Sequence, residues 1–159
     1  MKFIVVAVGH RMPEWIGAGF EDYARRMPRD ARLSLEEIRP AERGSAAATA
    51  ALNRALDLEH ERIRKMLPAG CRTVVLDERG TALSTRQLAS RIENWRSVGG
   101  DVAFVIGGAN GTAPALKEQA DFLWSLSKLT LPHGLVRVVL AEQLYRAISL
   151  LRGHPYHRD

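Results

Sequence analysis

Short apolar segments alternate along this chain with longer segments whose apolar residues recur at helical spacing. The first of them, residues 3–8, is an unbroken run rich in β-branched residues that ends at Gly9, as in a strand buried on both faces. Further strands are expected at residues 33–38, 73–76, 102–106 and 122–126, and helices at residues 13–27, 46–67, 84–98, 113–120 and 135–151. Because strands alternate with helices, the pattern predicts an α/β fold with a mostly parallel sheet flanked by helices.

The length of the chain suits a single domain. We expect residues 1–159 to form one unit. No apolar run approaches the roughly eighteen residues of a membrane span, and the first residues lack the small-residue cleavage site of a signal peptide. Cys71 is the sole cysteine, which excludes an internal disulfide and a cysteine-based zinc site. We expect a soluble, cytoplasmic protein with no membrane partner and no bound metal.

The balance of charge is basic, since 23 Lys and Arg residues against 18 Asp and Glu residues give a net charge of +5. Nineteen of the basic residues are arginine, whose guanidinium binds phosphate with two hydrogen bonds and stacks on bases. This favours a polyanionic partner, although codon usage in a GC-rich genome gives the same composition. One group of arginines is a candidate either for phosphate contact or for a solvated face: Arg25, Arg26, Arg29, Arg32, Arg39 and Arg43.

Three loops follow the expected third, fourth and fifth strands, at residues 76–80, 107–111 and 126–133. Ligands of open α/β sheets bind outside the carboxyl ends of the strands. The pair Gly107 and Gly108 lets the backbone approach a ligand closely, although a tight turn between strand and helix is the simpler explanation. The leucines of the third loop either line an apolar cleft for an adenine ring or complete the core.

The end of the chain is rich in ring side chains and arginine. His154, Tyr156 and His157 lie between Arg152 and Arg158, a composition suited to stacking on a base and holding phosphate. Two histidines three residues apart without a carboxylate partner make a poor metal site, and no serine lies in a nucleophile elbow. Upstream, His133 follows Pro132 at the mouth of the proposed cleft.

Apolar residues cover most of the circumference of the last expected helix, residues 135–151. Such a helix is buried on more than one side. In a domain of this size the second side is either a thicker core or a partner subunit. We favour a two-fold homodimer.

Several segments match one family in the same order along the chain. They are Val-Ala-Val-Gly at residues 6–9, Leu-Asp-Glu-Arg-Gly at 76–80, Ile-Gly-Gly at 106–108, Leu-Thr-Leu-Pro-His at 129–133, Leu-Val-Arg at 135–137, Glu-Gln-Leu-Tyr-Arg-Ala at 142–147 and Pro-Tyr-His at 155–157. With these segments the sequence resembles, over its whole length, the bacterial ribosomal RNA large subunit methyltransferase H family, of the SPOUT class.

The resemblance implies an enzyme that uses S-adenosylmethionine to methylate N3 of a pseudouridine in 23S rRNA, on the assembled ribosome. It also implies a homodimer and a deep trefoil knot in the C-terminal half. Thr81 and Gly134 depart from residues common in the family, without removing a cofactor contact. The implied cofactor contacts fall on the three loops singled out above: Leu76, Gly107, Leu126, Ser127, Lys128, Leu129, Thr130 and Leu131.

Methyl transfer to an imide nitrogen requires positioning and help with the departing proton. We hypothesise that Tyr156 or His157 contacts the uracil edge and that Arg137 stabilises the developing negative charge. With the tail reaching across a dimer, one subunit would hold the cofactor and the other would complete the target site. Contacts to the RNA are expected from His133, Arg152, His154 and Arg158.

Two other functions fit a basic α/β protein. A ribosome-binding assembly factor without chemistry would bind ribosomes in the absence of S-adenosylmethionine. An enzyme acting on a free nucleotide would not need RNA. Saturable cofactor binding and a requirement for ribosomes distinguish the methyltransferase from both.

Overall fold

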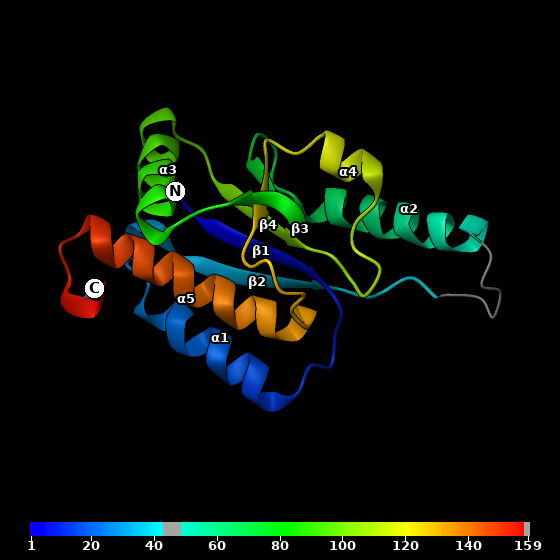
Figure 1. Ribbon diagram of the computed structural model, residues 1–159, viewed down its shortest axis with the longest axis horizontal. Coiled ribbons are helices and arrows are strands. Elements are labelled where there is room, and N and C mark those ends of the chain that lie inside the picture. Colours follow the sequence, from blue (N-terminus) through cyan, green and yellow to red (C-terminus); the bar gives the residue numbers. More distant parts are fainter. Residues whose placement is uncertain (43–48, 158–159) are drawn as a thin grey trace.

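A computed structural model describes residues 1–42 and 49–157 of the chain. Within these residues five strands form one sheet in the order β2-β1-β4-β3-β5, and every neighbouring pair is parallel (Figure 1). The expected α/β fold with a mostly parallel sheet is confirmed. The strands are β1 Phe3–Val8, β2 Leu33–Ile38, β3 Arg72–Ala82, β4 Val102–Ile106 and β5 Phe122–Ser125.

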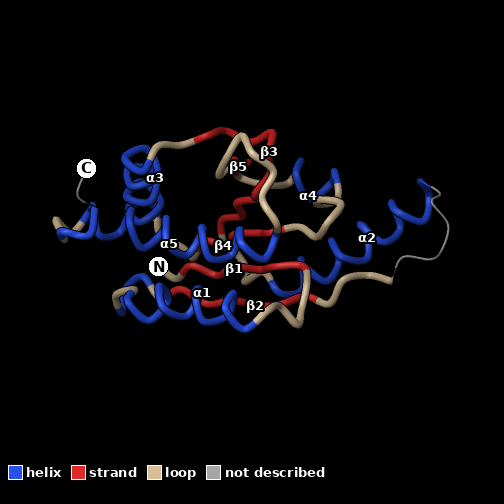
Figure 2. Tube along the Cα trace, turned by 60° about the horizontal axis from the view of Figure 1, so that its bottom comes forward, coloured by secondary structure: helices blue, strands red, loops and turns tan. Residues whose placement is uncertain are grey.

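Helices cover both faces of the sheet. On one face α1 and α5 lie side by side and α3 packs against α5, whereas α2 and α4 cover the opposite face (Figures 1 and 2). The helices are α1 Glu14–Arg26, α2 Thr49–Met66, α3 Thr85–Val98, α4 Pro114–Glu118 and α5 His133–Leu151, with short 3-10 turns η1 Arg29–Ala31 and η2 Pro155–His157.

The alternation of side chains along β1 divides the core into two layers. Phe3 and Val5 pack with Phe20 of α1 and Leu144 of α5. The intervening residues of the strand, such as Val6, pack in a second cluster that includes residues of α2 and α4. Every residue of β1 is buried, as the unbroken apolar run predicts for a strand covered on both sides.

Local signals in the sequence fix several helix ends. Ser84 accepts a hydrogen bond from the Gln87 amide at 3.2 Å, and the Gln87 side chain accepts one from the Ser84 amide at 2.8 Å, so the predicted capping box is present. Gly99 ends α3 with a φ of 86°. Helix α5 begins at His133, directly after Pro132 and two residues earlier than expected. Residues 46–48, expected in the second helix, lie outside the described residues.

The third strand differs from the prediction. Residues 77–80 were expected to form a turn that leaves the strand, but β3 continues to Ala82 around a bulge, because both Leu76 and Thr81 pair with Trp124 of β5. Gly80 lets β3 pair with β5 again after the bulge. A Cβ atom there would lie 2.8 Å from backbone atoms of Leu123 and Trp124, closer than any side chain tolerates.

We predict that Gly80→Ala destabilises the fold by about 1–3 kcal/mol, because the added methyl group meets backbone rather than a movable side chain. Gly17→Ala is the matched control. It lies within α1 with no heavy atom within 4 Å of the new Cβ, and removal of a helical glycine stabilises by up to about 1 kcal/mol. Urea unfolding followed by circular dichroism measures both. Equal stability of Gly80→Ala and the wild type would contradict the close approach.

Candidate active site

One cleft opens at the carboxyl ends of β3, β4 and β5. Its volume is about 770 Å³, within the range of small-molecule sites. Its walls come from residues 76–79 of the β3 bulge, 106–111 at the end of β4 and beyond it, and 126, 127 and 129–133 after β5, with Val136 of α5 and Lys117 of α4. The three loops that the sequence singled out therefore meet in space.

Most of the residues expected to contact the cofactor line this cleft. Leu76, Gly107, Leu126, Ser127, Leu129, Thr130 and Leu131 are among its lining residues, and so is His133. Lys128 is the exception, because it is exposed and does not line the cleft.

The glycine pair after β4 makes a sharp return of the backbone. A Cβ atom at Gly107 would lie 2.6 Å from the carbonyl group of Gly111, so only glycine fits there. The Gly111 amide donates to the Gly108 carbonyl at 2.9 Å. The sequence left open whether Gly107 and Gly108 form a tight turn or approach a ligand. The turn itself forms a wall of the cleft, so the two interpretations are compatible.

Short polar side chains shape the loop after β5. The Ser125 hydroxyl donates to the Ser127 carbonyl and the Ser127 hydroxyl accepts from the Leu129 amide, both at 2.9 Å. The Thr130 hydroxyl donates to Glu78 at 3.3 Å, which joins this loop to the β3 bulge across the cleft. The sequence left open whether the leucines of this loop complete the core or line the cleft. Leu126 packs against the core, whereas Leu129 lines the cleft and is 74% exposed.

An ion pair lies beneath one wall of the cleft. The ammonium of Lys117 binds the carboxylate of Asp77, which also accepts a hydrogen bond from the Arg79 amide at 2.9 Å. Partial burial acts to raise the pKa of Asp77, but Lys117 and the Arg79 amide outweigh it and hold that pKa below its ordinary value. Asp77 is therefore a carboxylate at neutral pH.

Arg137 lies behind the cleft. Its side chain is 1% exposed, Nη1 donates to Glu37 at 2.5 Å, and Nη2 donates to the Gly9 carbonyl at 2.9 Å. A Cβ atom at Gly9 would lie 3.2 Å from Arg137 Nη2 and 3.6 Å from His133 Nε2, so both side chains crowd this glycine. The guanidinium thus ties α5 to the turn after β1 and to the end of β2, and it is absent from the cleft lining.

The tail folds back on its own helix. The Tyr156 hydroxyl donates to Glu142 at 3.1 Å, and its ring lies 4.7 Å from that of Tyr145 and 4.9 Å from the guanidinium carbon of Arg146. Burial, a hydrogen bond with Tyr23 and the Glu142 carboxylate raise the pKa of Tyr156 well above its ordinary value. The phenol therefore stays protonated at neutral pH.

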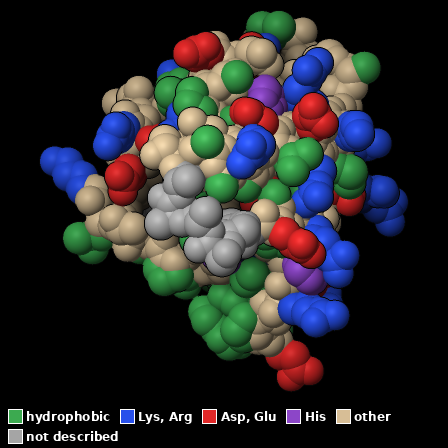
Figure 3. Space-filling view, turned by 90° about the vertical axis from the view of Figure 1, so that its right-hand side faces the viewer, with side chains coloured by type: hydrophobic (Ala, Val, Ile, Leu, Met, Phe, Trp, Pro, Cys, Tyr) green, Lys and Arg blue, Asp and Glu red, His purple; other side chains and the backbone are tan. Residues whose placement is uncertain are grey.

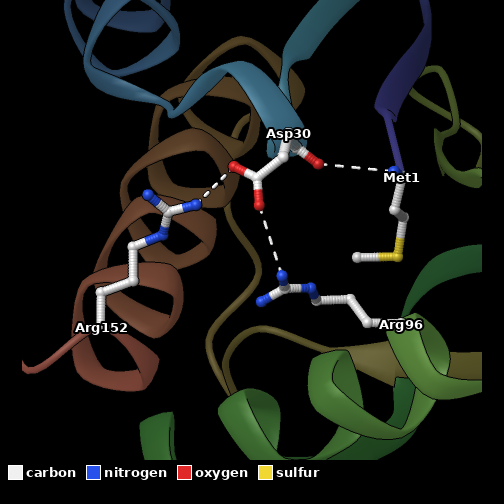
Figure 4. A network of polar contacts seen from close by, with 4 residues as sticks. All are labelled: Met1, Asp30, Arg96 and Arg152. Atoms are coloured by element: carbon white, nitrogen blue, oxygen red, sulfur yellow. Dashed lines mark hydrogen bonds and ion pairs between the residues drawn. The ribbon is translucent and has the colours of Figure 1, made fainter.

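Two further tail residues also have partners. Arg152 binds Asp30, whose other carboxylate oxygen accepts from Arg96 at 3.3 Å, while the Asp30 carbonyl accepts from the Met1 ammonium at 3.4 Å (Figure 4). His154 is exposed, and its Nδ1 accepts from the Tyr156 amide at 3.3 Å. The His157 side chain and Arg158 lie outside what the structure describes.

Helix α5 separates the two groups of predicted site residues. His133 and Val136 at its start line the cleft, whereas Arg152 and Tyr156 follow its end. Nineteen residues of helix span about 28 Å. Within one chain, the structure brings together the cofactor residues and His133, and it does not bring the tail to them.

Sequence reasoning missed some residues of the site. Glu37 gave no signal, because its contact with Arg137 joins positions 100 residues apart. Lys117 gave none either, since it reaches the cleft only because α4 folds over the β4 end of the sheet. Asp77 and Glu78 belong to a motif that the sequence analysis recognised as a loop, but their carboxylates carried no assigned role.

Comparison with known proteins agrees with this geometry. A family model described as "Predicted SPOUT methyltransferase" matches residues 1–157. The chain belongs to this family of SPOUT methyltransferases. The match extends from the first strand through the tail, so it includes both the cleft and the residues at the far end of α5.

Curated relatives of this SPOUT methyltransferase carry a more specific name. A protein of Nitrosospira multiformis is 59% identical over 158 residues, 99% of both chains, and is named ribosomal RNA large subunit methyltransferase H. Proteins with the same name from Ralstonia pickettii (54% identity, 99% of both chains) and Laribacter hongkongensis (50% identity, 100% of both) are also similar.

A solved structure supports the fold independently of close sequence similarity. A probable methylase family protein from Haemophilus influenzae aligns with a TM-score of 0.53 at 13% identity, over 99% of this chain and 70% of that one.

Among residues 1–42 and 49–157, no helix is long and apolar enough to cross a membrane. In the same residues no group of three or more His, Cys, Asp or Glu side chains is placed to hold a metal.

We predict that Asp77→Asn lowers stability by about 1 kcal/mol at pH 7, because it removes the charge that holds Lys117. The pKa of Asp77 is depressed in the folded state, so its contribution is fully present above the unfolded pKa of about 4 and is lost as pH falls through the folded value. The difference between wild type and variant should therefore begin to shrink below about pH 4 and vanish only when the pH lies below the lowered pKa of folded Asp77. Thermal unfolding between pH 7 and pH 2.5 measures it, and a difference independent of pH would contradict the ion pair.

Proposed function

We propose that this SPOUT methyltransferase transfers a methyl group from S-adenosylmethionine to N3 of a pseudouridine in 23S rRNA, on the assembled ribosome in the cytoplasm. The observation that carries the proposal is the convergence of three loops on one cleft. Those loops bear the residues that the family resemblance assigns to the cofactor. The names of relatives that are 50–59% identical over the whole chain support the ribosomal RNA substrate.

The cleft suits the proposed methyl donor. Leu76, Leu126 and Leu131 offer apolar walls for a flat ring, and Gly107 leaves backbone groups accessible beside them. Asp77 and Lys117, which both line the cleft, place an ion pair beside the proposed ligand. When bound, S-adenosylmethionine supplies a methyl group already activated by its sulfonium, so no metal is required. We propose Lys128, which is exposed at the rim, as a peripheral rather than a lining residue.

The chain's own contribution is to position the target base and to assist the loss of its N3 proton. Since the raised pKa of Tyr156 keeps its phenol protonated and its proton is donated to Glu142, we propose Tyr156 as a contact to the uracil edge and not as the base. His157 remains our candidate for the proton acceptor. Arg137 is already bound to Glu37 and Gly9, and we propose it as a positioning residue that holds His133 at the cleft.

A complete site needs a second copy of the chain. Because the end of α5 lies about 28 Å from its start and Tyr156 folds back only as far as Glu142, we propose that Arg152, His154, Tyr156, His157 and Arg158 serve the cleft of a partner subunit. Leu135 and Val139, one turn apart on α5, are half-buried and belong to neither core cluster. This face fits a two-fold homodimer. We also propose that the C-terminal half of the chain forms the deep trefoil knot that the family resemblance implies.

The test is transfer of a labelled methyl group to ribosomes that lack this modification, with free 23S rRNA and pseudouridine-free ribosomes alongside. We expect label only on assembled ribosomes that contain pseudouridine. A folded chain that binds S-adenosylmethionine but labels none of the three would contradict the substrate. A chain that binds ribosomes but not S-adenosylmethionine would instead be an assembly factor without chemistry.

A further inference from the structure

At the edge of the sheet where the strands begin, several cations have carboxylate partners, although Arg29 and Arg32 there are exposed without an ion pair among the described residues. Helices α1, α3 and α5 all end at the edge where the strands begin. There Arg25 pairs with Glu21 at 3.7 Å and Arg26 with Asp22 at 2.6 Å. At the same edge one carboxylate, that of Asp30, holds both Arg96 and Arg152 (Figure 4).

The opposite edge, where the strands end and the cleft opens, carries exposed cations without an ion pair among the described residues. One follows β1, one follows β2, one lies in the β3 bulge and one follows β5. They are Arg11, Arg39, Arg79 and Lys128. Figure 3 faces this end of the molecule and shows basic side chains along its rim, with acidic ones among them. We call these four residues the cationic rim.

The arginine group of the sequence analysis is therefore split. Strand β2 lies between Arg32 and Arg39, so the two arginines stand at opposite edges of the sheet. Arg43 lies outside the described residues. Arg25 and Arg26 have carboxylate partners at the far edge, whereas Arg39 stands beside the end of β1 and belongs to the rim.

Arg11 is the most constrained member of the rim. It has a φ of 56°, and among the described residues it is the one non-glycine residue with a positive φ. An unstrained chain would place glycine or asparagine in this conformation. The turn is held on both sides, since the Gly9 carbonyl accepts from Arg137 and the Gly9 amide donates to the Ile38 carbonyl at 2.8 Å. Arg11 is therefore an exposed residue of a turn whose Gly9 is fixed by Arg137 and by β2.

The charge pattern of this edge fits separate phosphates better than a uniformly negative surface. Asp77 and Glu37 already hold Lys117 and Arg137. Exposed carboxylates at Glu14, Glu42 and Glu78 interrupt the rim. A continuous anionic surface such as a membrane would meet these carboxylates, whereas an RNA strand presents phosphates at intervals, and a guanidinium binds each with two hydrogen bonds.

We propose that the cationic rim binds backbone phosphates of the RNA that flank the nucleotide entering the cleft. The proposal rests on the proposed function, because the nucleotide enters the cleft only if RNA is the substrate. It assigns the phosphate contacts to Arg11 and Arg39, which the family resemblance did not single out. It also gives Lys128 a phosphate to bind instead of the cofactor.

The test compares single variants of the full-length chain for binding to unmodified ribosomes over a series of salt concentrations. Arg11→Ala and Arg39→Ala should each weaken binding about tenfold at low salt and reduce the slope of log K against log salt by about one. Arg29→Ala, an exposed arginine of η1 at the far edge, is the matched control and should bind like the wild type. The affinity for S-adenosylmethionine should be unchanged in all three.

Two further substitutions separate charge from backbone strain. Arg11→Gly removes both, and Arg11→Lys keeps the charge. We expect Arg11→Gly to be at least as stable as the wild type and to bind ribosomes as weakly as Arg11→Ala, while Arg11→Lys recovers most of the affinity and the salt slope. Wild-type affinity and slope in Arg11→Gly would overturn the proposal. A wild-type chain that binds ribosomes but transfers no methyl group would contradict the proposed function and leave the comparison of salt slopes valid.

Discussion

The buried guanidinium of Arg137 fixes the start of α5 against the ends of β1 and β2. Removal of this charge from water is costly, and the cost is offset only because Glu37 and the Gly9 carbonyl both accept from it. Three parts of the chain that are distant in sequence are thereby held together at one edge of the sheet. The cleft depends on this arrangement, since His133 and Val136 form its α5 wall within a turn of Arg137. The exposed turn that carries Arg11 depends on it too.

Helix α5 has two further consequences for function. It is long enough to place the tail at the edge of the sheet opposite the cleft, where Asp30 holds Arg152 and the side chains of α5 hold Tyr156. Its half-buried residues Leu135 and Val139 lie near the cleft end. A two-fold partner seated on this helix would bring a second tail toward the first cleft. In the proposed dimer, α5 would separate the cleft from the tail of its own chain and would form the surface that brings the partner's tail to the cleft.

Much of this fold follows from local pattern. The apolar run of β1 predicts a central strand, Ser84 with Gln87 predicts a capped helix, and the loops after β3, β4 and β5 predict where a ligand would bind. Contacts between distant positions have no such local signal. The renewed pairing of β3 with β5 after the bulge depends on how closely the two strands approach at Gly80. The role of Arg137 depends on Glu37. The arginine group of the sequence analysis also could not be placed from local pattern. Arg32 and Arg39 are close in sequence, but strand β2 puts them at opposite edges of the sheet.

The most direct measurement of the split site is complementation between two inactive variants produced together. One chain carries Leu131→Glu, which places a charge in the apolar wall of the cleft but leaves the tail intact. The other ends after Arg152 and keeps an intact cleft. Each alone should transfer no methyl group, whereas the co-produced mixture should recover roughly a quarter of wild-type activity, because about half of its dimers are mixed and each mixed dimer has one complete site of two. Activity of the truncated chain alone, or no recovery from mixed dimers that bind S-adenosylmethionine, would contradict a site completed by the partner's tail.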